Sequence, residues 1–154
     1  MELSGERSVQ APLQVVWDAL HDPEILRKCT PGCRSLTAAV PAGEGAQTVY
    51  DAEMQVGVAL VKGTFKGTVT IVDETPLESY RVAVRASGGI GFSHIDGALR
   101  LAGTNGQTAI TYTGNAQLGG PIAGVGQRVL GGFARKQIER FFSAFEQELA
   151  DLES

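Results

Sequence analysis

The sequence predicts an α+β fold in which a curved antiparallel sheet of about seven strands wraps around a long C-terminal helix. Three observations predict it. Consecutive segments alternate apolar and polar residues, short turn-rich links join these segments, and an apolar stripe of helical period follows them. Because 154 residues suit one hydrophobic core, we expect a single domain over residues 1–154.

The N-terminal part combines strand and helix patterns. Residues 2–10 alternate loosely, which indicates a first strand. Pro12 and Pro23 each mark the beginning of a short helix, because proline is favoured at the first helical position. Residues 35–40 alternate more weakly and predict a further strand. Two short helices are therefore expected after the first strand.

Five segments with clear alternation follow. They are residues 48–56, 61–72, 80–86, 95–101 and 110–118. Each has one apolar face, as expected for antiparallel strands with one buried side. The apolar face includes Gly63, Gly67, Gly97 and Gly114, in a chain with 20 glycines. These glycines indicate bends in curved strands, space left beside the helix, or both.

The final segment predicts one long helix from Ala123 to Leu152. Its apolar stripe comprises Leu130, Ala134, Ile138, Phe141, Phe145 and Leu149. A second stripe lies almost opposite on the first half and comprises Ile122, Val125, Val129 and Phe133. We expect the two short helices to cover this second stripe. The alternatives are a mobile gate and a surface that contacts a partner or a membrane.

Composition and charge exclude several classes of protein. The net charge is -4 and Lys and Arg do not cluster, so nucleic-acid binding is not expected. No apolar run approaches the roughly 20 residues that span a bilayer. The first residues lack the basic-then-apolar order of a signal peptide. We expect a cytoplasmic protein, with peripheral contact at the inner face of the cell membrane as an alternative.

No pattern of catalytic or metal-ligating residues is visible. Cys29 and Cys33 have three residues between them instead of the two of a redox or zinc pair. His21 and His94 are not at metal-ligand spacing. Nucleophile-elbow, dinucleotide and phosphate-loop motifs are absent from the sequence. We therefore expect no metal site, no cofactor and no enzymatic activity.

The apolar face instead supplies candidate ligand-binding residues. Tyr50, Tyr80 and Tyr112 share this face, and their hydroxyls could orient a ligand or merely serve core packing. Arg7 has the same parity as Val9, so it could meet a polar head, although a bulge or edge position could turn it to solvent. The candidate set is Arg7, Tyr50, Met54, Phe65, Val84, Ile95, Tyr112, Leu130, Phe133 and Phe141.

A series of short motifs runs along almost the whole chain. The motifs are Ala11-Pro12 with Val16-Trp17, Leu20, Asp22-Pro23, Pro31-Gly32-Cys33, Val56-Gly57-Val58, residues 61–67, Pro76 with Ser79-Tyr80, Gly91-Phe92, Thr111-Tyr112, residues 119–123 and Gly126-Gln127-Arg128. Together they make the chain resemble the G-subunit family of carbon monoxide dehydrogenase, within the START-like or polyketide-cyclase-like (SRPBCC) superfamily.

The resemblance implies a helix-grip fold with a deep apolar cavity. It also implies genes that neighbour molybdenum hydroxylases, and a role in membrane recruitment of the dehydrogenase or in carriage of a quinone-like lipid. Family members often carry a C-terminal extension that can anchor to a membrane. Because this sequence ends at Ser154, we do not expect it to anchor autonomously. The family has no agreed catalytic motif to carry over.

Three functions follow from these observations. The first is a module that binds an apolar small molecule, such as a lipid or quinone, as an accessory protein of a molybdenum hydroxylase. The second is a docking or membrane-recruitment factor for that dehydrogenase, with an incidental cavity. The third is a cyclase- or hydrolase-like enzyme that uses cavity water and the tyrosines. A homodimer through strand edges or the second stripe is a further alternative.

Overall fold

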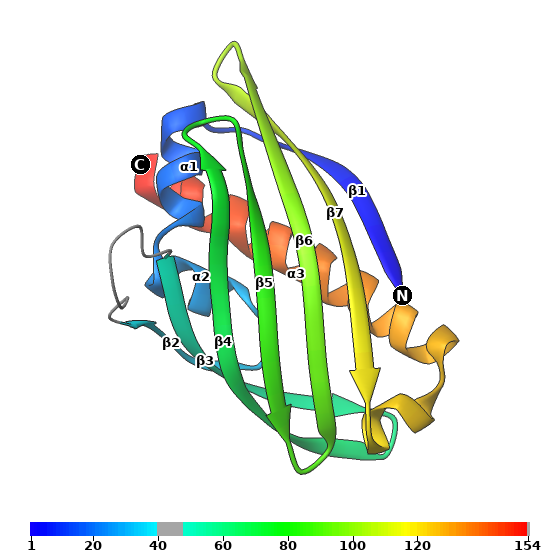
Figure 1. Ribbon diagram of the computed structural model, residues 1–154. Coiled ribbons are helices and arrows are strands. Elements are labelled where there is room, and N and C mark those ends of the chain that lie inside the picture. The colour runs from blue at the N-terminus through cyan, green and yellow to red at the C-terminus, as the bar shows by residue number, and fades with distance from the viewer. Residues whose placement is uncertain (40–47, 154) are drawn as a thin grey trace.

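The computed structural model describes residues 1–39 and 48–153 (Figure 1). The elements are β1 (Glu2–Val9), α1 (Leu13–Leu20), α2 (Pro23–Cys29), β2 (Cys33–Ala39), β3 (Thr48–Val58), β4 (Val61–Thr75), β5 (Ser79–Gly88), β6 (Gly91–Thr104), β7 (Gln107–Gly119), the 3₁₀ helix η1 (Pro121–Val125) and α3 (Gln127–Glu153). This order confirms the predicted two short helices and long final helix. Val40, at the end of the weakest predicted strand, lies outside the described residues.

The seven strands form one antiparallel sheet in the order β1-β7-β6-β5-β4-β3-β2. Strands β2 to β7 follow one another as neighbours, whereas β1 pairs with β7. Figure 1 shows α3 running diagonally across one face while the strands curve around it. The predicted α+β class, with a curved sheet around a C-terminal helix, is confirmed.

Alternation along the strands decides which residues meet α3. On β5, for example, Tyr80 is buried on the inner face and Arg81 is exposed on the outer face. On β6, Leu101 is buried and Arg100 is exposed in the same way. The sheet therefore has an apolar inner face toward α3 and a polar outer face toward solvent.

The prediction of one continuous helix from Ala123 was wrong. Residues 121–125 form η1 instead, and α3 begins at Gln127. The break lies at Gly126, whose φ of 98° is a conformation that residues with a side chain rarely adopt. No helix in the described part of the chain is long and apolar enough to cross a membrane.

The break also divides the predicted second stripe. Ile122 leaves the helix and is buried, with its backbone N–H donating to the Ile90 carbonyl at 2.9 Å. Val129 stays on α3 and is 48% exposed. Phe133 is half-buried against the cluster that contains Ile122. The expectation that α1 and α2 cover this stripe was wrong, because both helices pack at the other end of α3.

The apolar interior consists of two separate clusters. The first core cluster comprises Val9, Ala11, Val16, Trp17, Ala19, Leu20, Cys29, Tyr50, Ile71, Tyr80, Leu101, Ile110, Phe142, Phe145 and Leu149. The second core cluster comprises Val58, Phe65, Ile90, Ile122 and Leu130. Helices α1 and α2 contribute to the first cluster, and η1 contributes to the second. The long helix α3 joins them, with its C-terminal half in the first and its beginning in the second.

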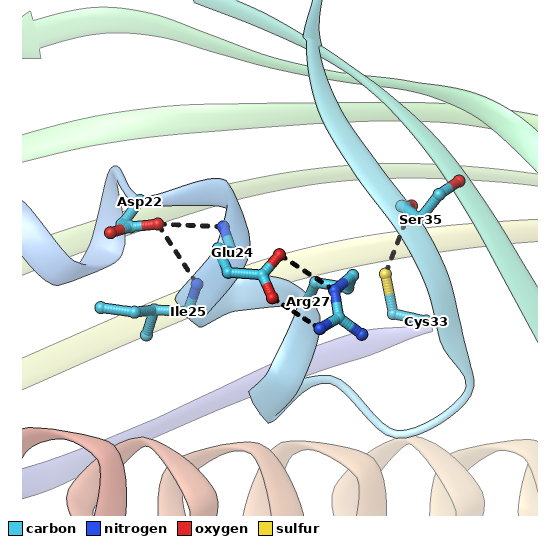
Figure 2. Close-up of polar contacts among 6 residues, drawn as sticks. All are labelled: Asp22, Glu24, Ile25, Arg27, Cys33 and Ser35. Carbon is cyan, nitrogen blue, oxygen red and sulfur yellow. Dashed lines mark hydrogen bonds and ion pairs between the residues drawn. The ribbon is translucent and has the colours of Figure 1, made fainter. Parts of the chain in front are cut away.

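Local polar contacts fix the beginning of α2 beside α3. The Asp22 carboxylate accepts hydrogen bonds from the backbone N–H groups of Glu24 at 2.9 Å and Ile25 at 3.3 Å (Figure 2). Asp22 therefore caps the helix and satisfies two of the donors that a helix leaves unpaired at its beginning. Within the helix, Glu24 accepts from Arg27 at 2.6 and 3.1 Å.

We predict that Asp22→Ala lowers the free energy of unfolding by about 1 kcal/mol, because the two N–H groups lose their acceptor. Urea denaturation followed by circular dichroism measures the change. Asp22→Asn is the matched control, since asparagine caps about equally well, and it should unfold close to the wild type. Equal midpoints for the alanine variant and the wild type would contradict the capping role.

Candidate ligand site

Between the two core clusters, the inner face of the sheet carries apolar residues that belong to neither. Leu3 on β1, Val84 on β5 and Ile95 on β6 are each half-buried, although they face the side covered by α3. The register places Leu3 opposite Gly114, Gly114 opposite Gly97, and Val84 opposite Ile95. These five residues form a band across four adjacent strands, which we call the central strip.

The two glycines leave the central strip open toward α3. A Cβ atom at Gly97 would meet only backbone, with the Thr113 carbonyl oxygen 3.2 Å away. At Gly114 the nearest atom would be the Asp96 carbonyl oxygen at 3.7 Å. No side chain of α3 comes within 4 Å of either position. The expectation that inward glycines leave space therefore fits these two positions.

Other inward glycines have a different role. A Cβ at Gly63 would collide with the Ile90 side chain, and one at Gly67 would collide with the backbone of β5. At Gly5 it would collide with the Tyr112 ring and hydroxyl. These three glycines allow close approach of a neighbour, so the predicted space does not occur at Gly63 and Gly67.

On the outer side of the same strands lies a hollow of about 770 Å³. It is lined mainly by outward-facing residues, both polar (Glu2, Ser4, Arg81, Thr113 and Asn115) and apolar (Val72, Ala83 and Ala98), and Leu3, Val82, Gly97 and Gly114 also border it. Asp96 also lines it and is ion-paired with Arg85 at 3.0 Å. Because this hollow is open and carries charged side chains, we place the candidate site for an apolar ligand on the inner face, where the strand residues are apolar.

A polar cluster lies where β1 meets α3. The Arg7 Nε donates to Glu146 Oε1 at 3.1 Å, and the two side chains are 32% and 38% exposed. The Arg7 guanidinium also lies 5.8 Å from the centre of the Phe142 ring. Strand β1 keeps an unbroken register with β7. The predicted bulge is therefore absent, whereas the edge position of β1 leaves Arg7 partly exposed beside Glu146.

The three tyrosines differ in how their hydroxyls are used. The Tyr50 hydroxyl donates a hydrogen bond to the His21 carbonyl at 3.1 Å, and burial raises the pKa of Tyr50. The Tyr80 ring is buried edge-on against the Trp17 ring, with 5.6 Å between the ring centres, and burial raises the pKa of Tyr80 as well. Tyr112 is half-buried, and its hydroxyl has no hydrogen-bond partner among the described residues. Of the three, Tyr112 is the best placed to meet a ligand.

The remaining candidates lie in three different surroundings. Phe65 and Leu130 are buried members of the second core cluster, and Met54 and Phe133 are half-buried against it. Phe141 is half-buried against the first core cluster. Val84 and Ile95 lie in the central strip, described above.

Sequence reasoning missed two residues of this region. Leu3 is not among the predicted site residues, and its pairing with Gly114 places it in the central strip. Phe142 is buried, whereas the predicted stripe used Phe141. A spacing of four, three and four residues through Ile138, Phe142, Phe145 and Leu149 would have found it.

Burial and local contacts define the surroundings of the two cysteines and of His21. Burial raises the pKa of the Cys29 thiol to about 11, and it also raises the pKa of Cys33. The Cys33 thiol donates to the Ser35 carbonyl at 3.5 Å (Figure 2). His21 contacts the Trp17 carbonyl at 2.7 Å through Nδ1 and Glu74 through Nε2. Within the described residues, no group of three His, Cys, Asp or Glu side chains could hold a metal ion.

Comparison with known families matches residues 5–150 to the family described as the G-subunit of carbon monoxide dehydrogenase (CoxG). No curated protein matches the chain. A conserved protein from Geobacillus kaustophilus is similar in structure, with a TM-score of 0.87 and 36% sequence identity. The alignment covers 98% of this chain and 96% of that one.

More distant structures share the fold. A START superfamily protein from Mycobacterium smegmatis has a TM-score of 0.74 and 11% identity, over 98% of each chain. The Zhui aromatase/cyclase from Streptomyces sp. R1128 has a TM-score of 0.69 and 17% identity, over 97% of this chain and 93% of that chain. At these identities the likeness shows the START-like helix-grip fold alone.

We predict that the Cys29 thiol titrates near pH 11, because burial disfavours the thiolate. The ultraviolet absorbance of a Cys33→Ser variant, minus that of the variant with both cysteines replaced by serine, isolates this thiolate. The comparison applies over the pH range in which circular dichroism shows an intact fold. Half-titration near the ordinary value of 9.0 would contradict the burial of Cys29.

Proposed function

The chain belongs to the CoxG family, the G-subunit family of carbon monoxide dehydrogenase, and on that premise we propose that it binds an apolar small molecule between the sheet and α3. The proposed ligand is a lipid or a quinone-like molecule. Its body would lie against the central strip, between the two core clusters. Met54, Phe133 and Phe141, half-buried on the cluster borders, would line the two sides.

The observation that carries this proposal is the partial exposure of the central strip. Apolar side chains that remain accessible inside a fold gain free energy when an apolar ligand covers them, by roughly 25 cal/mol per Å² buried. Leu3, Val84 and Ile95 offer such surface, and Gly97 and Gly114 add room beside it. The strip holds no ionisable side chain, which suits an uncharged ligand body.

The residue composition of the central strip favours binding over catalysis. An enzyme of the cyclase or hydrolase type needs a positioned acid, base or nucleophile at its ligand. The nearest described imidazole–carboxylate pair, His21 with Glu74, lies beside Trp17 and Tyr80 in the first core cluster. Family membership suggests that the partner is carbon monoxide dehydrogenase, a molybdenum hydroxylase, which this chain would serve as an accessory protein in the cytoplasm.

A second function, recruitment to a membrane, has its own observation. Leu60 in the β3–β4 turn is 98% exposed and Val129 on α3 is 48% exposed, and both flank the second core cluster. Residues 54–67 and 116–133, which build this end, contain no Asp or Glu. Their charged residues are Lys62, Lys66 and Arg128, and Lys66 is ion-paired with Glu53 at 3.5 Å. Exposed apolar side chains among cations fit a surface of anionic lipids.

Blocking the central strip tests the first function. We predict that Gly114→Leu weakens binding of a neutral naphthylamine dye at least tenfold, because the new side chain fills the space the ligand needs. Dye fluorescence in a titration measures the affinity. Thr113→Leu is the matched control, since it adds the same side chain to the outer face of β7 and should bind like the wild type. Equal affinities for the two variants would contradict the site.

Lipid vesicles test the second function. We predict that the protein sediments with vesicles that contain anionic lipid and that Leu60→Glu lowers the bound fraction severalfold, because it places a carboxylate at the contact. Leu152→Glu is the matched control, because Leu152 is also an exposed leucine, at 59%, but lies near the end of α3. Identical sedimentation of the two variants would argue against this contact.

A further inference from the structure

We propose that Arg7 and Tyr112 form a subsite that recognises a neutral carbonyl group on the ligand whose apolar body lies on the central strip. This inference rests on the proposed binding function and adds the chemical class of the ligand head. The two residues belong to adjacent strands, β1 and β7, and both touch Phe142 of α3.

Arg7 has donors left over after its ion pair. Its Nε is used by Glu146, while the two Nη groups have no partner among the described residues. A guanidinium has five N–H donors in a fixed plane, so most of them remain free for a ligand oxygen. Contact with the Phe142 ring and with Glu146 holds this plane between β1 and α3.

Tyr112 supplies a second free donor and contacts the same Phe142 ring as Arg7. Its ring stacks on Phe142, with 5.7 Å between ring centres. Its hydroxyl lies over Gly5, where any larger residue would collide with it. Among the described residues this hydroxyl has no hydrogen-bond partner, and it is not fully enclosed. Gly5 thus lets the hydroxyl reach the inner side of β1.

The strand register connects this subsite to the central strip. Along β1 and β7, the inward-facing pairs are Leu3 with Gly114, then Gly5 with Tyr112, then Arg7 with Ile110. Successive inward positions are about 7 Å apart along a strand. The Tyr112 hydroxyl is therefore one step from the strip and Arg7 is two steps away. A molecule of medium length could place its body on the strip and its head at these donors.

Charge selects the type of head group. The Glu146 carboxylate offsets the positive charge of Arg7, so the subsite offers N–H and O–H donors with little net charge. A ketone or ester oxygen accepts such donors without meeting repulsion. A carboxylate head would lie close to Glu146 and be disfavoured. The subsite therefore fits an uncharged carbonyl compound with an apolar tail.

The test compares three ligands of equal chain length: methyl nonyl ketone, undecane and undecanoate. Each displaces the neutral naphthylamine dye from the whole protein. We expect the ketone to bind about tenfold more tightly than undecane and more tightly than undecanoate, as one or two hydrogen bonds would give. Tyr112→Phe and Arg7→Met should each lower the preference for the ketone about threefold while leaving the affinity for undecane unchanged.

The ratio of affinities separates recognition from structure, since a variant that merely disturbs packing weakens ketone and undecane alike. Arg85→Met is the matched control, because it breaks an arginine ion pair on the outer face and should keep the full preference. Equal binding of ketone and undecane to the wild type would overturn the subsite and leave the proposed function standing. Failure of every ligand to displace the dye would overturn both.

Discussion

One helix has to cover the inner face of seven strands. An α-helix is about 10–12 Å across with its side chains, whereas neighbouring strands are about 4.8 Å apart, so the sheet is much wider than α3. Curvature reduces the difference in width, and additional elements cover part of the inner face that α3 leaves exposed. Helices α1 and α2 do so at one end and η1 at the other, which gives the two core clusters. The central strip is the part of the inner face that none of these elements covers.

The residues of the strip reflect this constraint. At Gly97 and Gly114 the sheet has no side chain, and no α3 side chain comes within 4 Å of where their Cβ atoms would be. Beside them, the contacts that Arg7 and Tyr112 each make with the Phe142 ring connect β1 and β7 to α3. The same limit on coverage thus produces an apolar surface for a ligand body and a set of donors for its head.

Local patterns in the sequence were enough to predict the elements, and they were not enough to predict how distant residues meet. Alternation located the strands because each has one buried face. The ion pair of Arg7 escaped prediction because Glu146 is 139 residues away in the chain. The break before α3 depends on the positive φ of Gly126, which helical periodicity does not encode. The division of the core depends on where α1, α2 and η1 pack against the sheet, so local sequence patterns did not predict the central strip.

Nuclear magnetic resonance offers the most direct measurement of where a ligand lies. In a methyl-labelled protein with unlabelled methyl nonyl ketone, filtered nuclear Overhauser spectra report which side chains touch the alkyl chain. The account predicts contacts from the alkyl protons to the methyl groups of Leu3, Val84 and Ile95. Contacts confined to Leu60 and Val129, or to outward-facing Thr113, would contradict a ligand site between the sheet and α3.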